Sequence, residues 1–237
     1  QTLRLVVRTS VAGSAVRIRL SNAAGAPAVT FGSARIALHR DGAAIRLETD
    51  RQLSFGGQTR TTLYGGVTLV SDPVPFEIPA SADLAVSLYV ESDATAPTNH
   101  RFGLRTAYLS SPGDHTAATD LNPAVATTET ILWLAGVDVL AASSARTIVT
   151  FGDSITDGDQ STPGTLGMWP ALLAARLQAN PPTRDVGVVN AGISGNRLLG
   201  DNGSGLARIR EDVLAVTGIK WMTLLIGIND ITGATRG

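Results

Sequence analysis

The chain has 237 residues, of which 43% are hydrophobic and 16% charged, and its formal net charge is −1. This is enough apolar material to bury a core, so the composition excludes a disordered chain, and the length favours two domains. The charge balance gives no reason to expect binding to nucleic acid or to an anionic membrane surface. The absence of cysteine excludes disulfides, thiolate zinc sites and a cysteine nucleophile.

The sequence has no apolar run that approaches the roughly 20 residues needed to cross a bilayer, so no membrane span is expected. The chain starts at Gln1 rather than Met and shows no charged-then-apolar leader. We therefore expect a processed or trimmed start, with the leader already removed from a secreted or periplasmic protein.

Residues 1–142 are predicted to form an all-β domain. Apolar and polar residues alternate there in short runs, which is the period of a half-buried strand, with turn-forming residues between the runs. The clearest runs are residues 3–8, 16–20, 34–38 and 84–90, and a last strand is expected at 131–140 after a long loop at 110–130. Short strands at this spacing, with no convincing amphipathic helix, predict a β-sandwich of jelly-roll-like type.

The pattern changes after residues 141–145, which are small and polar and are interpreted as a linker. Beyond it, residues 146–237 alternate short apolar strands with helices. The predicted strands are 147–151, 186–190 and 221–226, and the predicted helices are 169–177 and 206–216. This alternation indicates a parallel sheet with crossover helices, and the near-continuous apolar strands indicate a sheet covered on both faces.

Polar residues follow each of the three strands. Asp153 and Ser154 follow the first strand, residues 190–196 follow the second, and Asn229 and Asp230 follow the third. In an open parallel sheet, ligands bind beyond the carboxyl ends of the strands. The sequence therefore predicts a site where these three segments converge.

Ser154 is expected on a sharp turn at the start of a helix, where backbone N–H groups are free of intrahelical partners. A hydroxyl in that position can attack a carbonyl carbon while nearby N–H groups stabilise the oxyanion. Gly195 has no side chain to block its own N–H, and Asn229 offers a side-chain amide donor. These residues predict a nucleophile with a three-donor oxyanion hole.

Three segments carry a resemblance to a known family. Residues 151–158 (Phe-Gly-Asp-Ser-Ile-Thr-Asp-Gly) resemble the first block of the GDSL/SGNH hydrolases, residues 190–197 (Asn-Ala-Gly-Ile-Ser-Gly-Asn-Arg) resemble the second block, and residues 227–230 (Gly-Ile-Asn-Asp) resemble the third. The resemblance covers roughly residues 147–237. The all-β region is similar to the N-terminal domain of some lysophospholipase-like or carbohydrate-esterase-like members.

The resemblance implies the N-terminal half of a flavodoxin-like α/β/α domain that hydrolyses esters through an acyl-enzyme, without a metal or another cofactor. It implies that Ser154 is the nucleophile. The N–H groups of Ser154 and Gly195 and the amide of Asn229 would then form the oxyanion hole.

Five further residues near these blocks are expected to line the substrate pocket or to hold its loops. Asp153 is expected to accept hydrogen bonds from backbone N–H groups of the neighbouring loop. Asp157 either caps a helix or lines the pocket. Arg197 is expected to bond loop carbonyls in preference to substrate. Asn196 and Asp230 keep both readings, pocket-lining and structural.

The family's fourth block, an Asp-x-x-His segment that supplies the general base and its orienting carboxylate, has no match in the sequence. The three histidines lie in the all-β region, at His39, His100 and His115. We expect the base from a complementary C-terminal polypeptide, with this chain cut short or nicked near Arg236 and Gly237, rather than from the all-β region.

The sequence thus predicts a serine esterase acting on carboxylic esters with short acyl groups. Acetylated carbohydrates and lipid or small aryl esters both remain open as substrates. The alternative is a non-catalytic glycan-binding protein whose α/β part is a degenerate hydrolase.

Overall fold

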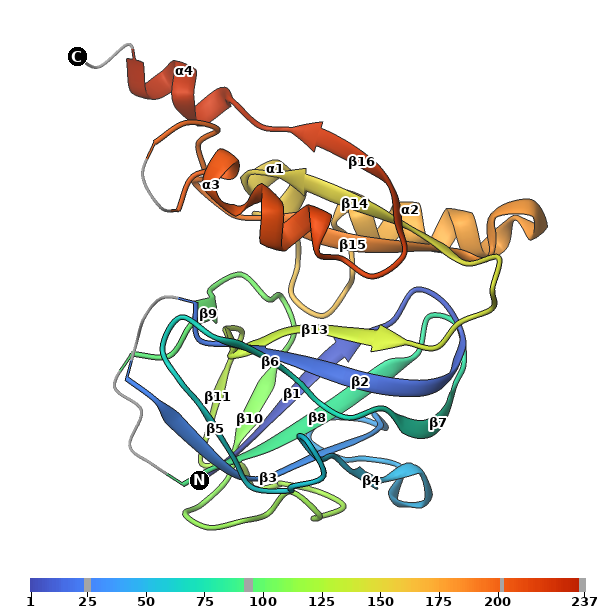
Figure 1. The fold of residues 1–237 in the computed structure, drawn as a ribbon, viewed down its shortest axis with the longest axis vertical. Coiled ribbons are helices and arrows are strands. Elements are labelled where there is room, and N and C mark those ends of the chain that lie inside the picture. The colour runs from blue at the N-terminus through green and yellow to red at the C-terminus, as the bar shows by residue number, and fades with distance from the viewer. Residues whose placement is uncertain (24–26, 92–95, 201–202, 235–237) are drawn as a thin grey trace. The chain divides into compact units, whose positions relative to one another are not determined.

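The computed structural model describes residues 1–23, 27–91, 96–200 and 203–234, so the predicted cut near Arg236 and Gly237 lies outside the described residues. The chain divides into two compact units, Gln1–Ala141 and Ala142–Gly237 (Figure 1). None of the described helices is long and apolar enough to cross a membrane.

The regular secondary structure described in the first unit is almost entirely strand. They are β1 (Thr2–Arg8), β2 (Gly13–Ser21), β3 (Val29–Leu38), β4 (Arg51–Gln52), β5 (Thr61–Leu63), β6 (Thr68–Val70), β7 (Val74–Ile78), β8 (Asp83–Val90), β9 (Asn99–His100), β10 (Ala107–Leu109), β11 (Ala126–Thr128), β12 (Ile131–Leu132) and β13 (Leu134–Val139), with one 3-10 turn, η1 (Leu47–Thr49). The prediction of a strand-rich region is confirmed. The jelly-roll-like topology stays a prediction.

Two antiparallel sheets enclose the core of this unit. Within the described residues, one sheet has the order β11-β10-β1-β8-β3-β4 with β5 also on β3, and the other has the order β13-β2-β6 with β7 also on β2. Leu5 of β1, Ile18 of β2 and Phe31 of β3 belong to one hydrophobic cluster, and none is more than 1% exposed. The inward faces of the two sheets therefore share a single core.

The strand predicted at 131–140 is interrupted at Trp133, which separates β12 from β13. Trp133 has a left-handed backbone with φ of 57°. Its ring packs edge-on against Phe31, with centroids 5.6 Å apart. The backbone N–H of Trp133 donates to the carbonyl of Thr98 at 2.9 Å. Burial of the indole in the core thus redirects the chain.

The predicted long loop at 110–130 contains the short strand β11.

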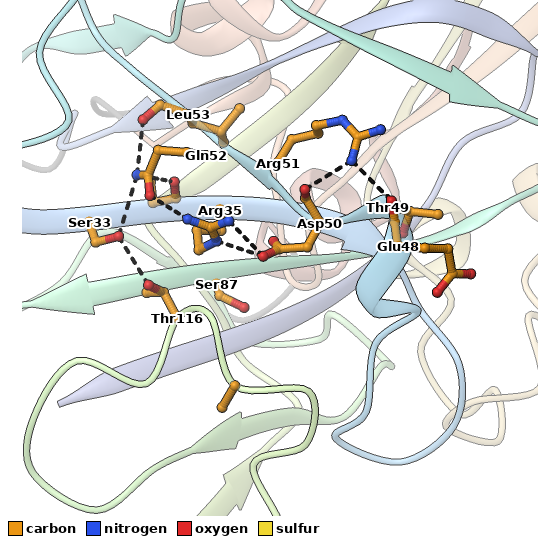
Figure 2. A network of polar contacts seen from close by, with 12 residues as sticks. Ser33, Arg35, Glu48, Thr49, Asp50, Arg51, Gln52, Leu53, Ser87 and Thr116 are labelled. Atoms are coloured by element: carbon orange, nitrogen blue, oxygen red, sulfur yellow. Dashed lines mark hydrogen bonds and ion pairs between the residues drawn. The ribbon is translucent and has the colours of Figure 1, made fainter.

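A buried polar network covers the outer face of the larger sheet (Figure 2). Arg4, Ser87 and Arg35 lie in register across β1, β8 and β3. Arg35 donates to Asp50 at 2.8 Å and to Gln52 at 2.6 Å. Arg4 is fully buried and donates to Ser87 at 2.8 Å, and burial lowers the pKa of Arg4 to about 10. Buried charges here are hydrogen-bonded, as their desolvation requires.

Asp83 opens β8 between two arginines. Arg8 and Arg105 approach its carboxylate to 2.8 and 2.9 Å. Burial alone would raise the pKa of Asp83, but hydrogen bonds from the two guanidinium groups, together with their charges, outweigh it and lower that pKa below its ordinary value. A lowered carboxyl pKa stabilises the fold above the unfolded-state pKa, and this contribution disappears as pH falls through the folded-state pKa.

We therefore expect Asp83→Asn to reduce the free energy of unfolding near neutral pH, with the difference from the unchanged chain shrinking as the pH falls below about 4. Urea unfolding at several pH values measures this. Asp41→Asn is the matched control, because the Arg40–Asp41 pair is exposed, with side chains 53% and 77% accessible. A difference for Asp83→Asn that does not change with pH would contradict the expectation.

The second unit is a parallel sheet with helices. Its strands are β14 (Arg146–Gly152), β15 (Val186–Gly192) and β16 (Ile219–Leu225), and its helices are α1 (Ser154–Asp157), α2 (Trp169–Ala179), α3 (Gly205–Ile209) and α4 (Ile228–Ala234), with a 3-10 turn η2 (Pro181–Thr183) and a π-helical turn η3 (Arg210–Leu214). All pairings are parallel and the order is β15-β14-β16. The central strand, β14, is therefore the first in sequence. The next strand, β15, lies on one side of it, and the chain then crosses over to place β16 on the other side.

The core of this unit lies where Val149 and Phe151 of β14 meet Val213 of η3, all at most 2% exposed. The single helix predicted at 206–216 is instead α3 followed by the π-helical turn, which brings Val213 onto the sheet. Helix α4 was not predicted, because its first turn and its glycine consist of residues that also form turns.

The sequence of strand β16 is almost wholly apolar, as in a strand covered on both faces, but its position in the sheet is different. It is an edge strand that pairs with β14 only, among the described residues. Trp221, Met222, Leu224 and Leu225 are 40–55% exposed. The apolar sequence of β16 is therefore not matched by burial within the described residues.

Candidate active site

The register of the sheet brings the three predicted segments to one end. Gly152 of β14 pairs with Gly192 of β15 and with Leu225 of β16. Ser154, Gly195 and Asn229 follow these three positions within a few residues. The winding direction reverses at β14, and ligands of open α/β sheets bind at such a reversal, beyond the carboxyl ends of the strands.

Ser154 is the first residue of α1 and is partly exposed. Asp153 is its N-cap, and the Asp153 carboxylate accepts a hydrogen bond from the N–H of Ile155 at 3.1 Å. Asp153 therefore fixes the helix start instead of bonding a neighbouring loop, because its extended backbone lies directly before the helix. No described residue accepts a hydrogen bond from the backbone N–H of Ser154.

Asp157 links α1 to the second block. Its carboxylate is 3% exposed and accepts a hydrogen bond from the N–H of Ser194 at 2.8 Å. A side chain on Gly192 would overlap the backbone of Asp157, so only glycine lets α1 approach β15 this closely. Asp157 thus neither caps the helix nor lines the pocket, and it holds the loop that leads to Gly195.

Gly195 has a left-handed backbone with φ of 78°, which a residue with a side chain rarely adopts. An added Cβ would meet no described atom within 4 Å. The backbone conformation, rather than lack of space, is therefore what requires glycine here. No described residue accepts a hydrogen bond from the Gly195 N–H.

Asn196 and Asn229 connect the second block to the third. Asn196 is 8% exposed, and its side-chain amide donates to the carbonyl of Gly203 at 2.6 Å. Asn229 Nδ2 donates to the backbone carbonyl of Asn196 at 3.0 Å. An amide nitrogen carries two hydrogens, so the second N–H of Asn229 remains for a ligand.

Asp230 of the third block also binds the segment that follows the second block. Its carboxylate accepts hydrogen bonds from the N–H groups of Leu198 at 2.8 Å and Leu199 at 3.0 Å. These two bonds lower the pKa of Asp230 below its ordinary value. Of the two readings kept from the sequence, the structural one describes both Asn196 and Asp230.

A pocket of about 230 Å³ lies at this end of the sheet. It is lined by Gly195, Arg197, Asn229, Thr232 and Gly233. Ser154 is not among its lining residues. Arg197 differs from the expectation, because no carbonyl of the described residues accepts a hydrogen bond from its guanidinium, which lies against Gly233 of the unpredicted helix α4.

One residue of this region, Arg208, was missed in the sequence. It is 9% exposed and donates to the carbonyl oxygens of Gly152 and Ala191, both at the carboxyl ends of strands. The available signal was an arginine next to Ile209 in an apolar helical stripe, four residues before Asp212.

In the part of the chain that the structure describes, no group of three or more His, Asp or Glu residues could hold a metal ion.

Comparison with known proteins finds a family that the C-terminal part of the chain resembles. Residues 150–237 match the model of the GDSL-like Lipase/Acylhydrolase family. An acetylxylan esterase of Geobacillus stearothermophilus is 38% identical over 95 residues, which are 37% of this chain and 41% of that protein. The chain thus spans less than half the length of this relative.

Two solved structures are similar over different extents. AlinE4, an SGNH-hydrolase family esterase, covers 40% of this chain with 46% of its own, at 24% identity and a TM-score of 0.32. A family two carbohydrate esterase from Clostridium thermocellum covers 94% of this chain with 62% of its own, at 16% identity and a TM-score of 0.25. TM-scores this low carry no argument about the fold, which rests on the strand pairings of this chain. The family match and the curated relative confirm the resemblance seen in the three sequence blocks: residues 150–237 are similar to the GDSL-like lipase/acylhydrolase family.

Proposed function

We propose that this chain supplies the nucleophile and the oxyanion hole of a serine esterase that hydrolyses carboxylic esters through an acyl-enzyme. One observation supports the proposal: three N–H groups that follow the ends of neighbouring parallel strands have no acceptor among the described residues. They belong to the backbones of Ser154 and Gly195 and to the amide of Asn229. Donors fixed in this way stabilise the negative charge that develops on a carbonyl oxygen.

In the proposed reaction, Ser154 Oγ attacks the ester carbonyl carbon and its proton passes to a general base. The carbonyl oxygen becomes negative and accepts hydrogen bonds from the three donors. Collapse of the intermediate expels the alcohol, which takes the proton from the base. Water then attacks the acyl-enzyme by the same route and releases the acid and Ser154.

Acetylated carbohydrate is the proposed substrate class. The support is the curated relative, which is named as an acetylxylan esterase. Lipid and aryl esters are the alternative substrates against which acetylated carbohydrate is tested.

A fluorophosphonate probe tests the nucleophile, because it labels a serine only when a base activates it. We expect one label on Ser154 in the active protein, and faster release of acetate from acetylated xylan oligosaccharides than cleavage of longer acyl esters. No label on Ser154, together with retained binding to xylan, would favour a glycan-binding protein with a degenerate hydrolase domain.

We further propose that the general base and its orienting carboxylate come from polypeptide that pairs with the free edge of β16. Residues 142–237 contain no histidine. Trp221 and Leu224 of β16 are 48% and 55% exposed, and an apolar edge strand of this kind invites pairing with another strand.

Trp221 reports on this pairing. We expect its fluorescence, isolated by comparison with Trp221→Phe, to be shielded from acrylamide in the active protein. An active preparation in which Trp221 is fully quenched would contradict the proposal.

The three histidines of the first unit are expected to be dispensable for activity. His39 contacts the carbonyl of Gly42 at 2.9 Å, and His115 contacts the hydroxyl of Ser111 at 3.2 Å, so both have local partners. The alanine variants of His39, His100 and His115 should each hydrolyse p-nitrophenyl acetate at a near-normal rate. Loss of activity in a variant that is still folded would identify the base in the first unit.

A further inference from the structure

Arg208 joins the first two segments of the candidate site through one side chain. From α3, its guanidinium donates to the carbonyl of Gly152 at 2.9 Å and to the carbonyl of Ala191 at 2.8 Å. Its Nε donates to the side-chain oxygen of Asn196 at 2.9 Å. These acceptors lie just before Ser154, at the end of β15, and next to Gly195.

Asn196 extends these contacts to the third segment. Its side-chain oxygen is held by Arg208, while its backbone carbonyl accepts the hydrogen bond from Asn229 Nδ2. Arg208, Asn196 and Asn229 therefore form one continuous chain of hydrogen bonds. The position of the second Asn229 N–H depends on the position of the Asn196 backbone, which Arg208 holds.

The environment of Arg208 suits arginine and no other cation. The guanidinium lies over the ring of Phe151, with Cζ 4.0 Å from the centroid, and pairs with Asp212 at 2.8 Å. A planar group with five donors in fixed directions can serve several acceptors at once, which a lysine ammonium on a flexible stem cannot do. Burial of the guanidinium makes these bonds necessary, because a buried charge without hydrogen-bond partners is costly.

We propose that Arg208 is a positioning residue for the oxyanion hole: it aligns the donors of Gly195 and Asn229 with Ser154 by holding the ends of β14 and β15 and the side chain of Asn196. The proposal rests on the proposed esterase function. Arg208 is 9% exposed and each of its guanidinium nitrogens donates to a protein acceptor, so it acts through its neighbours and not on the substrate. A shift of about 1 Å in catalytic groups can cost roughly a hundredfold in rate.

Arg208→Lys tests the proposal, since it keeps the charge and loses the fixed fork of donors. We expect kcat for p-nitrophenyl acetate to fall about tenfold to a hundredfold, with KM changed less than about twofold. Arg210→Lys, an exposed position in the adjoining turn, is the matched control and should leave both constants unchanged. Circular dichroism confirms that each variant is folded at the assay temperature.

A double-mutant cycle with Asn229→Ala separates positioning from general stability. If Arg208 acts through the oxyanion hole, Arg208→Lys should cost much less in the Asn229→Ala background than in the unchanged protein. Equal costs in both backgrounds, or an unchanged kcat in folded Arg208→Lys, would overturn the proposal.

Asn196→Ala is the second variant, for the case that Arg208→Lys does not fold. It removes the acceptor of Arg208 Nε while leaving the backbone carbonyl that Asn229 uses, and it should give the same loss of kcat and the same coupling to Asn229. An unchanged kcat would overturn the proposal. Failure of the esterase proposal is distinguishable, since the unchanged protein would then neither label at Ser154 nor hydrolyse the ester.

Discussion

Ser154→Ala is expected to lower ester hydrolysis by roughly 10⁴–10⁶-fold, the range for loss of a serine nucleophile, while the protein stays folded. The hydroxyl is the group that would form the acyl-enzyme, and the fold does not need it. Asp153 caps α1 through the Ile155 N–H, and the hydrogen bonds that link α1 to Asn190 and to Ser194 are made by Asp157 and not by the Ser154 side chain. Steady-state hydrolysis of p-nitrophenyl acetate and the thermal unfolding midpoint measure the two effects.

Ser161→Ala is the control for this variant, because Ser161 lies beyond α1 in the same segment. It should keep both hydrolysis and labelling by the fluorophosphonate probe, whereas Ser154→Ala should lose both. Near-normal turnover by Ser154→Ala would refute the assignment of the nucleophile. Loss of turnover with loss of folding would point instead to a structural role for Ser154.

The sequence was sufficient to predict the framework of the second unit. Each of its strands is a short apolar run that ends in glycine or polar residues, and strand boundaries in the structure lie within two residues of the predicted ones. Parallel strands all end at the same edge, so the strand order alone predicted that the segments of Ser154, Gly195 and Asn229 follow strand ends that lie in register. Local pattern and topology carry this information together.

Contacts between distant residues could not be predicted in the same way. Arg208 sits in a helix that satisfies its periodicity without it, and its role depends on carbonyl oxygens 12 to 56 residues away in sequence. Asp157 was expected to cap a helix or line the pocket, yet its carboxylate accepts a hydrogen bond from the N–H of Ser194. Side-chain hydrogen bonds of this kind depend on three-dimensional placement, which no periodicity encodes.

The exposed strand β16 illustrates a different limit. An apolar run predicts that a strand is covered, but not which polypeptide covers it. Trp221 and Leu225 are residue types typical of a central strand, but they are as exposed as residues of an edge strand. Trp133 shows the converse in the first unit, since its burial against Phe31 interrupts a strand that its sequence continues.

Asn229→Ala is expected to lower kcat by roughly 10²–10³-fold, the usual cost of one oxyanion donor, with a much smaller change in KM. Asn229 Nδ2 is held by the carbonyl of Asn196 at 3.0 Å, which fixes the direction of its second N–H. A donor whose direction is already set costs no reorganisation when negative charge develops, so its loss raises the barrier of the chemical step and hardly affects binding of the neutral ester.

Asn229→Asp sharpens this expectation, because it keeps the shape of the side chain but replaces the donor with a carboxylate. It should lower kcat at least as far as the alanine variant, and its charge would oppose the oxyanion directly. Asn180→Ala, at the exposed end of α2, is the control and should leave both constants unchanged. A rise in KM with kcat preserved in Asn229→Ala would mean that the amide binds the ground-state substrate, and the oxyanion hole would then rest on the N–H groups of Ser154 and Gly195 alone.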